Sequence, residues 1–112
     1  MKKLEIIIRH SRLEAVKAAL LECGIHGMTA YDVKGFGRQG GHKETYRGKE
    51  LVVDFSAKLK IEIALEDDLV EPVIKAVSDT AITGAVGDGK IFVLPLENVV
   101  RIRTGERGEG AL

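Results

Sequence analysis

A glycine-rich segment near the C-terminus carries the residues best suited to chemistry. Residues 84–91 read Gly-Ala-Val-Gly-Asp-Gly-Lys-Ile, which approaches the phosphate-binding pattern Gly-x-x-x-x-Gly-Lys but ends in isoleucine, where such an ATPase needs a magnesium-binding hydroxyl. The apolar run 91–96 that follows is typical of a strand, whereas a phosphate-binding loop of that class opens a helix. Glycines still let backbone N–H groups approach an anion, and Lys90 can neutralise its charge. The segment predicts a site that holds a nucleotide without splitting it quickly.

Two arginines beyond this run could complete an anion site. Arg101 and Arg103 are two residues apart in a segment expected to be extended, so their side chains should leave the same face. Paired guanidinium groups suit a phosphate chain, although the two could equally be solvated side chains. Asp88 could bind a ribose hydroxyl or order the turn through its own backbone, and its spacing does not separate these roles. Arg38 is a further candidate.

The composition gives little support to other kinds of chemistry. The three histidines are scattered and Cys23 is the single cysteine, so neither a metal site nor a disulfide is predicted. No serine has an evident base beside it, and we predict no catalytic residue. Lys plus Arg and Asp plus Glu both total 17, which leaves no basic excess for nucleic acid. No apolar run is long enough to insert into a membrane. We expect one cytoplasmic domain, 1–112.

The hydrophobic pattern predicts strands alternating with helices. Ser11 should cap a first helix, with Glu14 completing a capping box and Gly24 ending the helix. Asp67 or Asp68 should cap a second helix, whose apolar stripe ends near residue 77. The segment 37–50 has no apolar pattern, and we interpret this long loop as functional rather than disordered. The expected strands are 4–8, 28–36, 51–53, 59–65 and 91–96, followed by an extended segment at 99–103.

This order is the split pattern of a ferredoxin-like α+β sandwich, βαββαβ. Helices on one face would leave the other face of the sheet uncovered, and a homo-oligomer could cover it. An RNA-recognition module of similar topology needs stacking aromatic side chains on its central strands. Here only Phe92 is available, in a run that looks buried. A copper chaperone of this topology needs paired cysteines, so both alternatives are disfavoured.

Five stretches make the chain resemble the PII nitrogen-regulatory signal-transduction family over essentially its whole length. They are 33–39, 46–48, 52–55, 83–84 with 87–93, and 100–108, of which the last two are the most specific. The resemblance implies a homotrimer in which ATP and ADP compete for clefts between subunits and 2-oxoglutarate binds beside Mg-ATP. It also implies a T-loop at about 37–54 that changes shape with the ligand and docks onto targets, a B-loop at about 82–90 and a C-terminal loop at about 102–112.

The resemblance further implies a role for individual residues. Gln39 would bind the Mg²⁺ that bridges ATP and 2-oxoglutarate, and Lys58 would pair with a carboxylate of the acid. The nucleotide-binding residues would be Ile7, Thr29, Gly35, Gly37, Arg38, Gln39, Glu62, Ala64, Gly87, Asp88, Gly89, Lys90, Arg101 and Arg103. The 2-oxoglutarate-binding residues would be Gly37, Gln39, Gly40, Gly41 and Lys58. Tyr46, Arg47 and Leu51 would reach the target, which would be an ammonium channel, engaged peripherally at the membrane, or a nitrogen-metabolism enzyme or regulator.

Several positions depart from the family pattern. Leu51 replaces a T-loop tyrosine that many bacterial members carry for uridylylation or adenylylation, and Lys49 stands where some members have a phosphorylated serine. Gly40, Ile82 and Ala85 replace common cations. We therefore expect a sensor of ATP/ADP and 2-oxoglutarate that acts through T-loop conformation alone. The alternatives are an adenine-nucleotide sensor with a lost or altered 2-oxoglutarate response, a slow ATPase, and a structural oligomer with a vestigial site.

Overall fold

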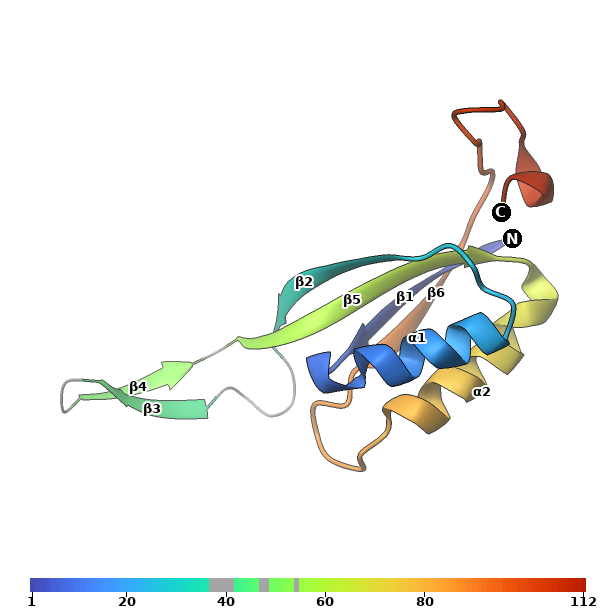
Figure 1. The fold of residues 1–112 in the computed structure, drawn as a ribbon. Helices are drawn as coiled ribbons and strands as arrows, with labels where there is room; N and C mark the ends of the chain where they lie inside the picture. The colour runs from blue at the N-terminus through green and yellow to red at the C-terminus, as the bar shows by residue number, and fades with distance from the viewer. Residues whose placement is uncertain (37–41, 47–48, 54) are drawn as a thin grey trace.

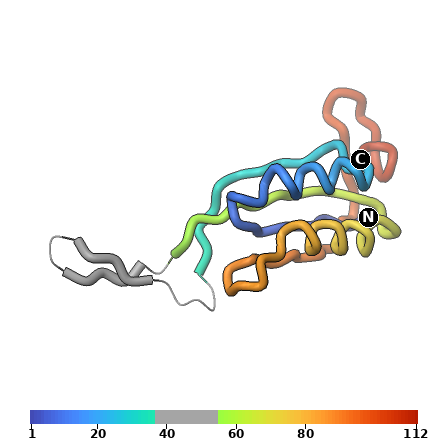
Figure 2. The backbone as a smooth tube through the Cα atoms, turned by 60° about the horizontal axis from the view of Figure 1, so that its bottom comes forward, coloured from blue at the N-terminus to red at the C-terminus, as the bar shows by residue number. Residues whose placement is uncertain are grey.

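The computed structural model describes residues 1–36, 42–46, 49–53 and 55–112. Its body is a four-stranded antiparallel sheet with two helices on one face (Figures 1 and 2). The strands in spatial order are β2 (Thr29–Gly35), β5 (Ser56–Leu65), β1 (Lys2–Ile8) and β6 (Lys90–Pro95). The helices are α1 (Leu13–Glu22) and α2 (Val70–Ala81), with single turns of 3-10 helix at η1 (His10–Arg12), η2 (Asp67–Leu69) and η3 (Gly108–Ala111). The predicted ferredoxin-like α+β fold is confirmed.

Alternation along β1 and β5 separates a buried face from an open face. Leu4, Ile6 and Ile8 of β1 are buried beneath the helices, because successive side chains of a strand point to opposite sides. The remaining core is formed by Val16, Leu20, Ile25, Leu59, Ile61, Ile63, Leu65, Val70, Val73, Val77 and Ala81. The open face carries an ion-pair network of Lys3, Glu5, Lys60 and Glu62, with N–O distances of 3.3 to 3.6 Å.

Strand β6 lies at an edge of the sheet and exposes apolar side chains. Phe92 is 46% exposed and Val93 44% exposed, so the prediction that Phe92 lies in a buried run is wrong for the single subunit. An exposed apolar edge strand is a surface that natural proteins usually cover. The sequence pattern could not reveal this, because an apolar run reads alike whether its own chain or another copy covers it.

The helix starts differ from those predicted. Ser11 lies within η1, and the residue before α1 is Arg12, which makes no side-chain capping hydrogen bond. Asp67 and Asp68 lie in η2, and Asp67 pairs with Lys2 at 3.1 Å. A 3-10 turn before each helix displaces the capping position by one or two residues, to Arg12 and Leu69, so the predicted caps are wrong. Gly24 does follow α1 with the positive φ of 86° that favours glycine there.

The segment predicted as a long loop contains a second, two-stranded sheet. Strand β3 (His42–Tyr46) pairs with β4 (Lys49–Val53), with His42 opposite Val53 and Tyr46 opposite Lys49. The prediction placed strand structure only from residue 51 and is therefore incomplete. The polar side chains of β3 hid the strand, since a hairpin outside the core needs no apolar alternation.

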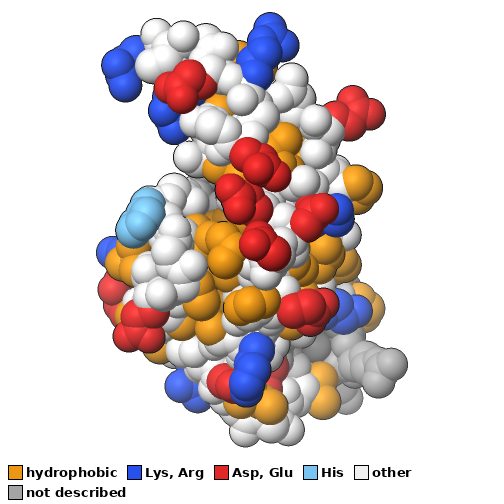
Figure 3. Space-filling view, turned by 90° about the vertical axis from the view of Figure 1, so that its right-hand side faces the viewer, with side chains coloured by type: hydrophobic (Ala, Val, Ile, Leu, Met, Phe, Trp, Pro, Cys, Tyr) orange, Lys and Arg blue, Asp and Glu red, His pale blue; other side chains and the backbone are white. Residues whose placement is uncertain are grey.

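The C-terminal tail folds back on itself instead of running extended. Residues 102–104 form a turn, Gly105 has φ +73°, and an isolated bridge joins Val100 to Arg107. The tail starts beside the beginning of β1, where Leu96 N donates to Met1 O at 3.2 Å. In Figure 3 it stands as a lobe above the sheet and helices, with cationic side chains on its surface.

Candidate functional site

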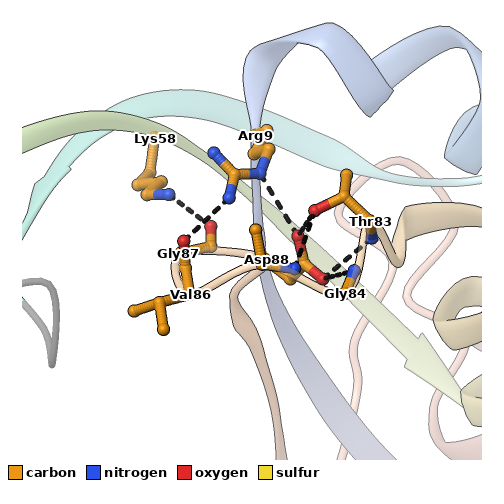
Figure 4. A network of polar contacts seen from close by, with 8 residues as sticks. Arg9, Lys58, Thr83, Gly84, Val86, Gly87 and Asp88 are labelled. Atoms are coloured by element: carbon orange, nitrogen blue, oxygen red, sulfur yellow. Dashed lines mark hydrogen bonds and ion pairs between the residues drawn. The ribbon is translucent and has the colours of Figure 1, made fainter.

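The loop between α2 and β6 is organised around the carboxylate of Asp88 (Figure 4). That carboxylate accepts hydrogen bonds from Thr83 N at 2.8 Å, from Gly84 N at 2.9 Å and from the Thr83 hydroxyl. Arg9 Nε adds an ion pair at 3.3 Å. The Thr83 hydrogen bonds are the main reason that the pKa of Asp88 lies well below its usual range. Of the two roles left open by the sequence, the Asp88 side chain takes the one that orders the loop.

Two cations from the sheet reach the same loop. Arg9, just after β1, donates from Nη2 to Val86 O at 2.9 Å, and Lys58 of β5 donates from Nζ to Gly87 O. Lys58 is only 8% exposed. Burial lowers the pKa of Lys58, the nearby Arg9 charge lowers it further, and Asp88 partly offsets both effects. A buried ammonium beside a guanidinium favours an incoming anion, because an anion would relieve the repulsion between them.

Gly89 fixes how closely the loop passes the sheet. A Cβ on this residue would lie 1.7 Å from the carbonyl oxygen of Ile7, and φ is +109°. No other residue type fits this position without moving the backbone. The close approach leads directly into the pairing of Lys90 with Ile7, where β6 joins β1. The glycine therefore sets the position of Lys90.

These elements surround a cavity of about 490 Å³, a size typical of small-ligand sites. The predicted binding residues that line it are Ile7, Gly35, Lys58, Gly87, Asp88, Gly89 and Lys90. Phe36, Ala85, Val86 and Phe92 complete the lining. Arg9, which the sequence interpretation missed, lies beside this cavity and lines an adjoining recess with Lys58 and Gly87. Its only sequence signal is a cation directly after a buried strand, which is too common to be informative.

The other described nucleotide-site residues lie farther along the sheet, from the middle of β1 to the tail. Thr29 pairs with Glu62, which lies opposite Glu5 in the middle of β1. Ala64 pairs with Lys3 near the start of β1, where the tail carrying Arg101 and Arg103 also begins. The cavity lies at the end of β1, so the start of the tail is roughly 20 Å from Ile7 along the strand, whereas Glu62 is only roughly 7 Å along it. Tyr31 donates to Glu62 at 2.8 Å, and this bond is the main cause of the lowered pKa of Glu62. One subunit therefore does not bring the predicted site together.

The two tail arginines also diverge from each other. Arg101 Nη1 donates to Glu106 Oε1 at 2.9 Å, whereas Arg103 is exposed in the turn. The prediction that both side chains leave one face of an extended segment is wrong, because the turn at 102–104 replaces the period of two. Gly37, Arg38, Gln39, Gly40, Gly41 and Arg47 lie outside the described residues, and only backbone positions are described for Tyr46 and Leu51.

Two further classes of feature can be assessed over the described part of the chain. No group of three or more His, Cys, Asp or Glu residues there could hold a metal ion. No helix there has the length and apolar character needed to cross a membrane. The described residues thus form a ferredoxin-like subunit whose ordered glycine loop faces a cavity with convergent cations.

Comparison with known proteins places this subunit in a family. The model of the nitrogen regulatory protein P-II family matches residues 1–106, and the chain belongs to that family. The nitrogen regulatory protein P-II of Azospirillum brasilense is 59% identical over 112 residues, and that of Rhodospirillum rubrum is 56% identical, with both chains covered completely in each case. These are signal-transduction proteins rather than enzymes, so the prediction of a regulatory, non-enzymatic protein is confirmed.

A solved structure supports the same assignment. The crystal structure of Arabidopsis thaliana PII bound to citrate is 47% identical in sequence and matches with a TM-score of 0.80. The match covers 99% of this chain and 91% of the plant chain. The family resemblance and the fold predicted from the sequence are therefore both confirmed.

Proposed function

We propose that this PII-family protein senses ATP/ADP and 2-oxoglutarate and regulates nitrogen-metabolism targets in the cytoplasm through its T-loop. The observation that carries the proposal is the division of the predicted site between two ends of one sheet. The cavity end supplies Lys90 and the glycine loop, and the tail end supplies Ala64 and Arg101. Neither end alone offers both a phosphate loop and the remaining nucleotide contacts.

A ring of subunits would unite the two half-sites. If the cavity end of one subunit meets the tail end of the next, the contact is heterologous, and a closed ring of such contacts has cyclic symmetry. Three copies would make three equivalent clefts. The exposed apolar side chains of β6 support the proposed homotrimer, because a neighbouring copy would remove them from water.

The nucleotide would enter with its phosphates toward the glycine loop. Gly87 and Gly89 have positive φ and would offer backbone N–H groups to the phosphates, and Lys90 stands at the start of β6. Asp88 would keep the loop in shape rather than touch the phosphates, since its carboxylate already pairs with Arg9 and accepts hydrogen bonds from Thr83 and Gly84. The adenine and ribose would rest against Ile7 and Gly35 on one side and against the neighbour's Thr29, Glu62 and Ala64 on the other.

The acid would bind where Lys58 and Arg9 meet. Both side chains now donate to backbone carbonyls of the loop, and a carboxylate is a stronger acceptor than a carbonyl. Gln39 would hold the Mg²⁺ joining the acid to ATP, with Gly37, Gly40 and Gly41 around it. The citrate bound to the Arabidopsis protein supports a carboxylate ligand for this fold.

The response would reach a target through the T-loop. Arg47, with Tyr46 and Leu51 beside it, would engage an ammonium channel or a nitrogen-metabolism enzyme or regulator. Leu51 has no hydroxyl, so the signal would be conformational and independent of uridylylation at this position. Each ligand would favour the loop geometry that it contacts best.

Titration calorimetry and light scattering test this function. We expect trimeric mass, binding of ATP and of ADP in competition, and binding of 2-oxoglutarate only with Mg-ATP present. Lys58→Met should abolish acid binding and spare ATP binding, whereas Lys17→Met, an exposed change on α1, should leave both intact. Nucleotide binding without any acid response would favour the nucleotide-only sensor. A monomer that binds no nucleotide would contradict the proposal.

A further inference from the structure

The side chain of Glu106 pairs with the guanidinium of Arg101, which the proposed nucleotide site needs. Arg101 Nη1 donates to Glu106 Oε1 at 2.9 Å, and Arg101 Nη2 reaches Leu112 O at 3.4 Å. A carboxylate facing a guanidinium is the closest protein counterpart of a phosphate, since each presents two anionic oxygens that a guanidinium can bind. We propose that Glu106 is an internal competitor that must release Arg101 before Arg101 can bind the phosphates of a nucleotide. This inference rests on the proposed function.

The backbone of the tail is arranged so that this release needs no unfolding. Arg101 N donates to Glu106 O at 2.9 Å, and Gly105 N donates to Arg101 O at 2.8 Å. These bonds close the turn at 102–104 without help from either side chain. The ion pair can therefore open while the tail keeps its fold, and the change is a rotation of two side chains. The tail can then present Arg101 to a neighbouring subunit.

Because the Arg101–Glu106 pair is exposed, replacing Glu106 by a phosphate costs little free energy. The Arg101 side chain is 39% exposed and that of Glu106 48% exposed, and an ion pair at such exposure holds only weakly. A polyphosphate carries several charges and can use both guanidinium donors, so it outcompetes one carboxylate. Glu106 would thus lower nucleotide affinity modestly and would keep Arg101 from pairing with stray anions when the cleft is empty.

Glu109 provides a matched control in the same tail. It is exposed three residues beyond Glu106, and no ion pair of its side chain is found among the described residues. Glu106→Gln and Glu109→Gln remove the same unit charge from the tail. A difference between them isolates the contact with Arg101 from the general effect of net charge on anion binding.

The experiment titrates the full-length chain and both variants with ATP, tripolyphosphate and adenosine by calorimetry. We expect Glu106→Gln to bind ATP and tripolyphosphate about two- to fivefold more tightly, which is the range set by an exposed ion pair. Glu109→Gln should increase the affinity for ATP and tripolyphosphate clearly less. Adenosine affinity should not change, because adenosine has no phosphate to compete.

Three results would overturn the inference. Weaker ATP binding in Glu106→Gln would mean that Glu106 positions Arg101 for the ligand, and equal shifts in the two variants would reduce the effect to net charge. A change in adenosine affinity would point to a general disturbance of the cleft. Failure of the proposed function is separately recognisable, since then the unmodified chain would bind neither ATP nor tripolyphosphate, and both proposals would fall.

Discussion

Two side chains in this subunit perform the same local task in different surroundings. Asp88 accepts hydrogen bonds from Thr83 N and Gly84 N at 2.8 and 2.9 Å, and Asn98 accepts from Val99 N and Gly108 N at 2.9 and 3.1 Å. Each oxygen satisfies two backbone donors and holds a turn-rich segment together. The glycine loop and the C-terminal tail are thus ordered by the same kind of hydrogen bond, from backbone N–H groups to a side-chain oxygen.

The glycine loop and the tail differ in the contacts that connect them to the core. Arg9 ties Asp88 to the end of β1, Lys58 ties Gly87 to β5, and Gly89 presses against Ile7. Beyond Leu96, the hydrogen bonds found among the described residues join the tail only to itself. Contacts with the sheet therefore fix the conformation of the loop, whereas the conformation of the tail depends on hydrogen bonds within the tail. A segment of the second kind is free to be repositioned by a neighbour or a ligand.

The largest effect should come from breaking the anchor at Gly89. Gly89→Ala places a Cβ 1.7 Å from the Ile7 carbonyl oxygen, so the loop or β1 must move, and we expect a loss of unfolding free energy of about 3 kcal/mol or more. Gly84→Ala is the control, because its φ is also positive but nothing lies within 4 Å of the new Cβ. It should cost about 1 kcal/mol. Urea denaturation measures both, and equal losses would contradict the close approach.

Removing the charge at the centre of the loop should have the next largest effect. Asp88→Asn keeps the shape of the side chain but leaves Arg9 without its ion pair and weakens the charge-assisted bonds from Thr83. Nucleotide affinity should fall roughly tenfold through loss of loop order. The melting temperature should fall less than in Gly89→Ala. Asp68→Asn, an exposed change in η2, is the control and should alter neither quantity.

The same carboxylate gives the loop a distinctive acid response. The pKa of Asp88 is held well below its usual range, so its stabilisation is complete above the ordinary aspartate pKa of about 4. It is lost only as the pH falls through the lowered pKa of the folded state. The difference in melting temperature between the unmodified chain and Asp88→Asn should therefore be constant from pH 7 to 5 and shrink in stronger acid. A difference that vanishes between pH 7 and 5 would refute this assignment.

The sequence predicted the anchored region better than the free one. Local patterns predicted the glycine loop, the strand after it and the order of strands and helices along the chain. They did so because burial of β1, β5 and α2 enforces those patterns. The partnership of Arg9 with Asp88 spans 79 residues, and no spacing rule can reveal so distant a contact. In the tail, the segment 99–103 was expected to be extended, with Arg101 and Arg103 on one face, but the turn closed by Gly105 has no apolar signature. Segments without a core leave little trace in hydrophobic periodicity.

The smallest expected effect belongs to the tail and would sharpen the contrast with the loop. Asn98→Ala removes the side-chain acceptor of Val99 N and one of the two acceptors of Gly108 N, which also donates to Val99 O at 3.0 Å. The loss of such a cap costs about 1 kcal/mol. Because the tail is held only by its own bonds, this cost should appear as faster hydrogen exchange of the Gly105 and Gly108 amides. The Gly84 amide, protected by Asp88 at the other end of the sheet, serves as the internal reference and should not change. If Gly84 exchanged faster as well, the tail and the loop would be one cooperative unit, and the distinction between an anchored and a self-supporting segment would fail. If the tail amides kept their protection, Asn98 would be redundant and the backbone bridge between Val100 and Arg107 would suffice to hold the tail.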